Sequence, residues 1–208
     1  MNTSDPGLSK DFFDSAYRQT PPWDIGAPQP DLLALLNDFP PTSPVLDVGC
    51  GTGELALALA QHGLTVLGVD LAEGAIAQAR VKAANAAPDV SQRIEFRIAD
   101  ALHPALLGMF GTVVDSGFFH LFGPVEREHF AHELAAALPP GGRYYLMGFA
   151  IDTGRPNPPR SVRIEELQSL FTAETGWRVV MLRPAQFLTR FSSKVEAVAA
   201  CFERSEAR

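Results

Sequence analysis

The sequence has few cysteines, no long apolar run and no apolar leader, and each absence narrows the class of protein. The only cysteines among its 208 residues are Cys50 and Cys201, which form no CxxC pair or other framework. This pattern favours a reduced, cytoplasmic setting. No apolar run approaches the roughly 20 residues that a membrane span needs. Residues 1–10 are polar, without the apolar core of a signal peptide. We therefore expect a cytoplasmic protein with no membrane partner.

Positive charge is also scarce. The chain has 24 Asp and Glu against 17 Lys and Arg, and its net charge is −7 at pH 7. A protein that follows a nucleic-acid backbone carries a basic face, so we expect a small-molecule substrate and no nucleic-acid partner. The length and the hydrophobic content of 46% suit one globular domain with a full core, acting as a monomer or a homodimer.

From Val45 onward, short apolar runs alternate with helix-forming stretches. The pattern predicts strands at 45–48, 65–69, 94–98, 112–115 and 144–149, and helices at 54–62, 72–86 and 125–138. Such alternation is typical of βαβ units and of a parallel sheet covered on both faces. Two later apolar runs, at 177–182 and 197–202, have no crossover helix between them and predict an antiparallel edge. The predicted class is α/β, with a doubly wound, mostly parallel sheet.

The most informative segment is VLDVGCGTGE, at residues 45–54. A β-prone run leads into a turn in which Gly49, Gly51 and Gly53 alternate with other residues, and a helix former follows at once. A strand, a glycine-rich turn and a helix N-terminus in succession predict a nucleotide-binding cradle. A dinucleotide fingerprint needs its third glycine where this chain has Glu54, and an acid there would repel a pyrophosphate.

Acidic residues lie at or near the ends of four predicted strands. Asp47 precedes the glycine turn, Asp70 lies about 20 residues beyond it, and Asp100 and Asp115 end the next two strands. Ligands of a doubly wound sheet bind outside the carboxyl ends of its strands. Asp70 is placed to accept hydrogen bonds from ribose hydroxyls, and Asp100 from an adenine amino group. We therefore expect a nucleoside ligand at this edge.

The order of these segments resembles the motifs of class I S-adenosylmethionine-dependent methyltransferases. The matching segments are VLDVGCGTGE, VLGVDLAEGAI, RIADA, VVDSGFFH and LPPGGRYYLM. The resemblance implies a Rossmann-like fold with a seven-stranded sheet, S-adenosylmethionine as cofactor and S-adenosylhomocysteine as product. The glycines would face the methionine part of the cofactor. The expected cofactor-binding residues are Tyr17, Trp23, Asp47, Gly49, Gly51, Thr52, Gly53, Asp70, Leu71, Asp100, Ala101 and Asp115.

The N-terminal stretch narrows the resemblance. Residues 13–17 (FDSAY) and 20–26 (TPPWDIG) are similar to the lid of the thiopurine, halide and thiol methyltransferase group. They are closer to small bacterial enzymes that methylate heterocyclic toxins such as N-hydroxyquinolones, as are DSGFFHLF and PPRSV. The implied layout is one methyltransferase domain over 1–208. It would comprise an N-terminal helical lid (1–40), a cofactor-binding core (41–150), and a substrate loop with an antiparallel edge (151–208).

The residues expected to bind the methyl acceptor are Tyr17, Phe118, His120 and Arg160. Aromatic rings suit flat substrates and tolerate a cation. His120 is the candidate catalytic residue, because imidazole titrates near neutral pH and could accept a proton from a hydroxyl group. The alternative is that His120 only shapes the pocket and positions the substrate. Arg160 could hold an anionic oxygen or sulfur, or it could be a solvated loop charge.

No metal site is expected. Glu128, His129, His132 and Glu133 resemble a ligand cluster, but they lie within one predicted helix, away from the strand ends and without a distant further ligand. The predicted function is methyl transfer to an O, N or S atom of a small aromatic or heterocyclic molecule, for which detoxification is one expected role, or to a halide or thiol. A nicotinamide-dependent oxidoreductase and a protein that binds the cofactor without catalysis are the alternatives of another class.

Overall fold

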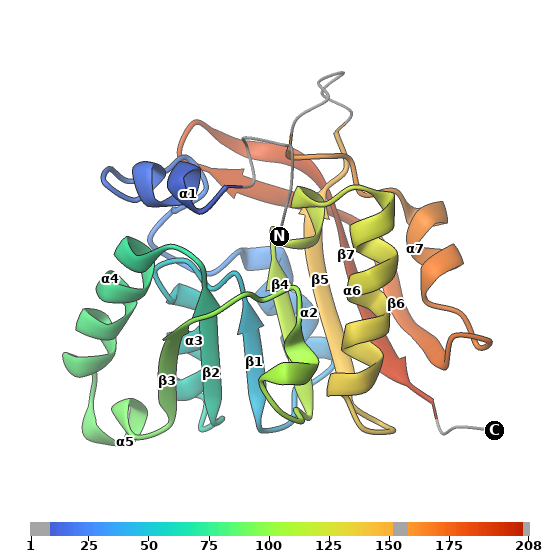
Figure 1. The fold of residues 1–208 in the computed structure, drawn as a ribbon, viewed down its shortest axis with the longest axis horizontal. Helices are drawn as coiled ribbons and strands as arrows, with labels where there is room; N and C mark the ends of the chain where they lie inside the picture. The colour runs from blue at the N-terminus through green and yellow to red at the C-terminus, as the bar shows by residue number, and fades with distance from the viewer. Residues whose placement is uncertain (1–8, 152–157, 206–208) are drawn as a thin grey trace.

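The chain folds around a seven-stranded sheet, seen in a computed structural model that describes residues 9–151 and 158–205 (Figure 1). The strands are β1 (Val45–Val48), β2 (Val66–Asp70), β3 (Ile94–Ile98), β4 (Thr112–Ser116), β5 (Arg143–Phe149), β6 (Trp177–Thr189) and β7 (Ser192–Arg204). Their order is β3-β2-β1-β4-β5-β7-β6. Strands β1 to β5 pair in parallel, and β7 runs antiparallel to β5 and β6. The predicted α/β class with a mostly parallel sheet is confirmed.

The direction in which strands are added reverses at β1. Strands β2 and β3 lie on one side of β1, and β4 and β5 lie on the other. A crevice forms outside the carboxyl ends of the strands at such a switch point. Because β1 ends at Val48, the glycine turn that follows it lies at this crevice.

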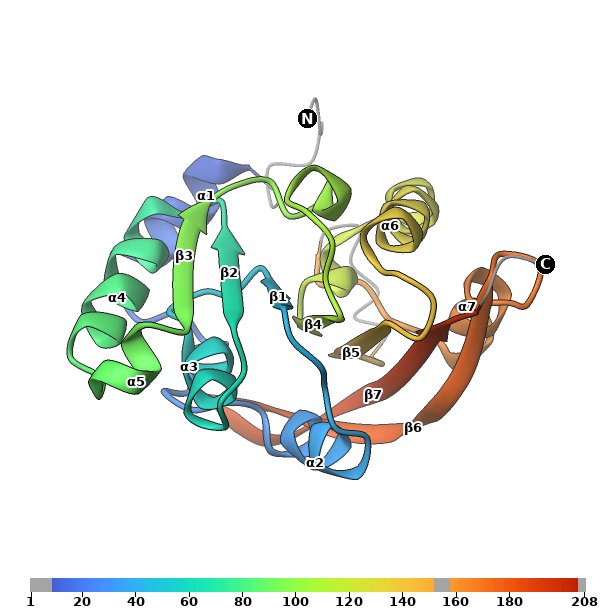
Figure 2. The same cartoon turned by 90° about the horizontal axis from the view of Figure 1, so that it is seen from below.

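Helices cover both faces of the sheet (Figure 2). On one face lie α2 (Pro30–Asp38), α3 (Glu54–Gln61) and α4 (Glu73–Ala84), and on the other lie α6 (Pro124–Ala137) and α7 (Ile164–Leu170). Successive residues of a strand point to opposite faces, so the neighbours Tyr144 and Tyr145 on β5 belong to different core clusters. The shorter helices are α5 (Pro88–Ser91), η2 (Pro104–Leu106) and η3 (Phe119–Leu121). Within the described ranges, no helix combines the length and the apolar character that crossing a membrane requires.

The sequence predicts the central elements well and the antiparallel edge poorly. Strands β1 and β3 have the predicted bounds, whereas β6 and β7 are about twice as long as the two apolar runs that predicted them. The far half of this hairpin is only partly buried and carries polar residues and Pro184. It therefore gives no apolar signal.

The N-terminal segment crosses the carboxyl-end edge of the sheet. Helix α1 (Lys10–Ala16) begins it and lies near the start of α4 (Figure 1). Tyr17 packs on Ala72 and Ala75. The segment is fastened to the β6–β7 hairpin, because the Gln29 side-chain amide donates to the Leu188 carbonyl (2.9 Å) and accepts from the Leu188 N–H (2.8 Å). Sequence reasoning missed this attachment, which joins residues 159 positions apart.

Candidate active site

A cavity of about 600 Å³ lies at the carboxyl ends of the strands, between the sheet and the N-terminal segment. This volume is in the range of sites that enclose small molecules. Of the predicted site residues, the cavity brings together Tyr17, Trp23, Asp47, Gly49, Gly51, Thr52, Asp70, Leu71, Ala101, Phe118 and His120. Residues from both ends of the chain thus meet at one site.

The glycine turn is shaped by two close approaches. Gly51 has φ +54°, and a Cβ there would lie 2.8 Å from the Tyr17 hydroxyl oxygen. Gly49 has φ +63°, and a Cβ there would lie 2.8 Å from the Phe118 ring. Residues that carry a side chain rarely adopt such φ values, and a Cβ at either position would push the neighbouring ring away. The two glycines therefore let aromatic residues from the N-terminal segment and from the β4 loop close on the turn.

Two carboxylates line the cavity, the buried Asp47 and the partly buried Asp70, and they have different partners. Asp70 accepts hydrogen bonds from the Gly51 N–H and the Ala72 N–H, both at 2.9 Å. Asp47 is 2% exposed, and its Oδ2 has no hydrogen-bond partner. Burial raises the pKa of both carboxyls, for Asp47 well above its usual range and with help from the nearby charge of Asp115. An unpaired buried acceptor is costly unless a ligand supplies a donor.

Of two side-chain hydrogen bonds at this place, the first lies within the N-terminal segment and the second joins the segment to the glycine turn. The Trp23 Nε1–H donates to the Tyr17 hydroxyl (3.1 Å), and the Thr52 hydroxyl donates to Asp24 Oδ2 (2.9 Å). Asp24 also accepts from the Gly26 N–H. Asp24 is a site residue that sequence reasoning did not single out, although the Trp-Asp pair had marked its segment.

His120 lies at the aromatic side of the cavity. It is 7% exposed, its ring stacks on Phe149 at 4.7 Å between centroids, and Phe187 lies 6.2 Å away. Its Nδ1 accepts a hydrogen bond from the Phe149 N–H (3.3 Å). Burial, with the positive charge of Arg127, lowers the His120 pKa to about 3. The imidazole is therefore neutral at physiological pH.

Some predicted residues lie elsewhere. Asp115 is fully buried, and its carboxylate accepts from the Phe118 N–H, the Phe119 N–H and the Tyr144 hydroxyl. Burial raises its pKa to about 7. The Asp115 carboxylate thus braces the loop that carries Phe118 and His120 and is not among the described residues that line the cavity, and its expected cofactor contact remains a prediction.

Three further predicted residues are not among the described residues that line the cavity. The Asp100 carboxylate accepts from the Leu102 N–H, and a Cβ at Gly53 would meet the Phe96 ring. The Arg160 N–H donates to the His120 carbonyl. Their expected ligand contacts remain predictions.

The residues that sequence reasoning missed are mostly apolar. The cavity is also lined by Ile25, Leu121, Phe149, Pro158, Pro159 and Phe187. Phe149 ends β5 and could have been proposed from its place at a strand end. Phe187 lies within β6, where nothing in the local pattern marks it.

Comparisons with known proteins agree with this geometry. The family model described as a methyltransferase domain matches residues 45–142. The 2-heptyl-1-hydroxyquinolin-4(1H)-one methyltransferase of Mycobacteroides abscessus is 34% identical over 192 residues, covering 85% of this chain and 81% of that protein. A probable thiol methyltransferase of Arabidopsis thaliana is 29% identical, covering 72% and 66%.

Solved structures extend the likeness over nearly the whole chain. A structure from work on the conversion of a disulfide bond into a thioacetal group during echinomycin biosynthesis has a TM-score of 0.79 and 32% identity. It covers 96% of this chain and 94% of its own. The predicted resemblance is thereby confirmed over the N-terminal segment and the antiparallel edge as well as the core.

Proposed function

The chain belongs to the S-adenosylmethionine-dependent methyltransferases, and we propose that it methylates an O, N or S atom of a small aromatic or heterocyclic molecule whose acceptor atom binds in its ionised form. The proposal that the acceptor atom binds in its ionised form rests on the hydrogen bond from the Phe149 N–H to His120 Nδ1. Family membership sets aside the nicotinamide-dependent alternative.

The residues of the glycine-turn side suit the cofactor. S-adenosylmethionine, when bound, supplies an electrophilic methyl group on a positively charged sulfur and carries an ammonium group. Asp47 Oδ2 is buried at the cavity without a donor, so it suits that ammonium group. Asp70 has both oxygens fixed by backbone N–H groups, which orients its remaining lone pairs for ribose hydroxyls.

The hydrogen-bond pattern supports a role for His120 as a hydrogen-bond donor. A backbone N–H can donate only to an unprotonated ring nitrogen, so Nδ1 of the neutral ring carries no proton. The proton is then on Nε2, which lies on the side of the ring that faces Gly117. Because His120 and Gly117 both line the cavity, the proposal gives His120 Nε2–H the role of a donor to the acceptor atom and not that of a general base.

This donor favours an acceptor atom that is already anionic. An Nε2–H group stabilises an oxyanion or thiolate and holds it for in-line attack. The surrounding rings of Phe149 and Phe187 exclude water, and a low-polarity cavity strengthens attraction between opposite charges. Groups that ionise near neutral pH, such as N-hydroxy heterocycles, acidic phenols and thiols, fit this requirement. The two named relatives act on such groups by their names, a hydroxyquinolone and a thiol.

The first test is a mass-spectrometric screen of N-hydroxyquinolones, phenols, thiols and halides with S-adenosylmethionine. We expect methylated product from acceptors with low pKa values, and rates that follow the ionisation of the acceptor as pH rises. Transfer that favours weakly acidic alcohols, with an enzyme group setting the pH profile, would contradict the proposal. Cofactor binding without methylation of any acceptor would support the non-catalytic alternative.

His120 variants separate donation from shape. Glutamine keeps an N–H donor near the position of Nε2, whereas phenylalanine keeps the ring and removes the donor. Because one lost donor to a developing or full anion costs about 10²-fold or more, we expect His120→Phe to lose that much in kcat/KM and His120→Gln to retain most of it. Activity retained in His120→Phe and lost in His120→Gln would show that the aromatic shape matters instead, and equal losses would contradict a role for the donor alone.

Other parts of the proposal rest on composition. The single-domain layout, the state of monomer or homodimer, the cytoplasmic location and the lack of a nucleic-acid partner stay predictions. They do not affect the chemistry of the cavity.

A further inference from the structure

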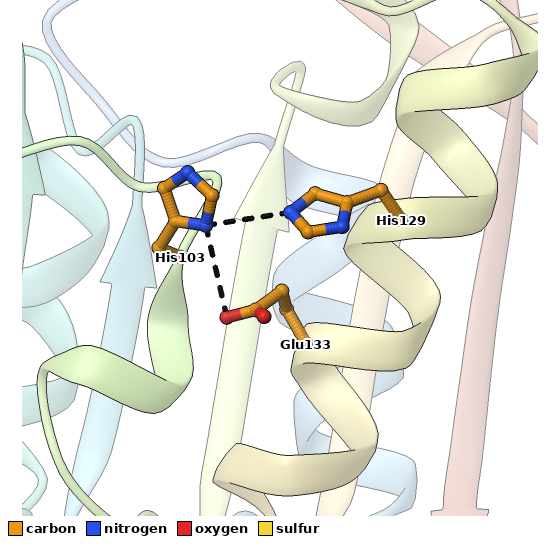
Figure 3. A group of neighbouring side chains, drawn as sticks. All are labelled: His103, His129 and Glu133. Atoms are coloured by element: carbon orange, nitrogen blue, oxygen red, sulfur yellow. Dashed lines mark hydrogen bonds and ion pairs between the residues drawn. The ribbon is translucent and has the colours of Figure 1, made fainter.

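Three potential metal ligands meet on the face of α6, outside the cavity. His129 and Glu133 lie one turn apart on α6, and His103 approaches them from the segment between β3 and η2 (Figure 3). The distance from His129 Nε2 to His103 Nδ1 is 3.3 Å, and from His103 Nδ1 to Glu133 Oε2 it is 3.9 Å. His103 is the distant ligand that sequence reasoning did not find, because nothing in the sequence brings residue 103 to α6.

The distance between the two imidazole nitrogens matches the spacing in a tetrahedral site. Zinc with ligand bonds of about 2.0–2.1 Å places ligand atoms about 3.4 Å from one another. All three ligand atoms lie within 4.8 Å of one another, and the two imidazole nitrogens already stand at the expected separation. The ring centroids are 5.1 Å apart at an interplanar angle of 71°. The Glu133 carboxylate, 3.9 Å from His103 Nδ1, would move closer on binding an ion to complete the triangle.

We propose that His103, His129 and Glu133 form a binding site for a divalent transition-metal ion, with Zn²⁺ as the best match. Two imidazoles and one carboxylate are ligands typical of zinc, whereas Mg²⁺ and Ca²⁺ prefer sites made of oxygen. The side chains of His103 and Glu133 are 40% and 20% exposed. An ion can therefore enter from solvent, and water can take the fourth position.

The site links two parts of the fold rather than serving methyl transfer. None of the three ligands is among the described residues that line the cavity. His103 follows Ala101, which does line it, and the Leu102 N–H between them donates to Asp100 Oδ1. A bound ion would fasten the segment after β3 to α6 and so hold one wall of the cavity.

The test is calorimetry with zinc chloride on untagged, chelator-treated protein. We expect one equivalent to bind at pH 7.5, and MgCl₂ at the same concentration to give no binding. His103→Ala and His129→Ala should each weaken zinc binding more than about tenfold, and Glu133→Gln should weaken it as well. His132→Ala is the matched control, because His132 is exposed on the same helix outside the cluster, and it should bind as the parent does.

A second measurement covers the case in which a variant folds poorly. Zinc should raise the melting temperature of the parent and of His132→Ala, because an ion that binds only the folded state stabilises it. Circular dichroism of the zinc-free variants reports whether they are folded. No saturable zinc binding by the parent, or equal binding by the parent and a folded His103→Ala, would overturn the proposal. The contact between His103 and His129 would then be only a hydrogen bond between two imidazole rings.

Discussion

The two sides of the cavity are built in different ways. The glycine-turn wall (Asp47, Gly49, Gly51, Thr52 and Asp70) comes from 24 consecutive residues, and its geometry is fixed by backbone N–H groups and buried carboxylates. The aromatic wall (Trp23, Phe118, His120, Phe149 and Phe187) comes from distant segments, and ring packing holds much of it together.

This difference between the two walls indicates which wall determines cofactor binding and which determines the choice of methyl acceptor. Charged hydrogen bonds need particular residues at fixed distances, and losing one is expensive. Ring contacts mainly supply area and shape, and conservative changes to them cost less. We therefore expect the glycine-turn wall to fix the cofactor and the aromatic wall to select the methyl acceptor.

The largest expected effect on cofactor binding comes from Asp70→Ala. The change removes the acceptor for the Gly51 and Ala72 N–H groups together with the proposed ribose contact. Each lost bond to a charged group costs about 1–3 kcal/mol, so the Kd for S-adenosylmethionine should rise about 10- to 100-fold by calorimetry. Asp89→Ala, at an exposed position of α5, makes the same charge change and should leave the Kd unaltered. An unchanged Kd in Asp70→Ala would remove this residue from the cofactor site.

A smaller effect is expected on the opposite wall from Phe187→Leu. Leucine keeps an apolar side chain but removes the ring contacts with His120 and Phe149. Because an aromatic pair contributes about 0.5–1.5 kcal/mol, kcat/KM for an aromatic acceptor should fall about two- to tenfold while the cofactor Kd stays the same. Phe191→Leu is the control, since Phe191 is 84% exposed near the hairpin turn. If Phe187→Leu weakened cofactor binding as much as acceptor use, the division between the walls would be wrong.

The same contrast explains what the sequence could predict. The glycine-turn wall is local, so the run from Val45 to Glu54 carries the strand, turn and helix start within ten residues. The aromatic wall depends on how the edge hairpin returns to the N-terminal segment through Gln29 and Leu188. No hydrophobic periodicity in the sequence predicts that contact between the hairpin and the N-terminal segment. Local sequence patterns therefore cannot identify Phe187 as a site residue.

The acidic residues at strand ends show a second limit on what the sequence can predict. Asp47, Asp70 and Asp115 look equivalent in the sequence, yet only the first two line the cavity. Asp115 is held inside by the Tyr144 hydroxyl of the neighbouring strand β5. The sequence gives each acid's place along its strand, but the partner that captures the side chain comes from tertiary packing.

The smallest expected effect is on the stability of the cofactor-free protein, and it comes from Asp47→Asn. Burial raises the folded-state pKa of Asp47, so the native state binds its proton more tightly than the unfolded state does. Stability from this group is then greatest below its ordinary pKa of about 4 and is lost as pH rises. The neutral amide should therefore raise the melting temperature by a few degrees at pH 8 and by less at pH 4.5. Asp89→Asn, at an exposed site, should show no such pH-dependent gain. An equal shift in Asp47→Asn at both pH values would mean that the buried carboxylate already has a partner, and the glycine-turn wall would then lose its open acceptor for the cofactor's ammonium group.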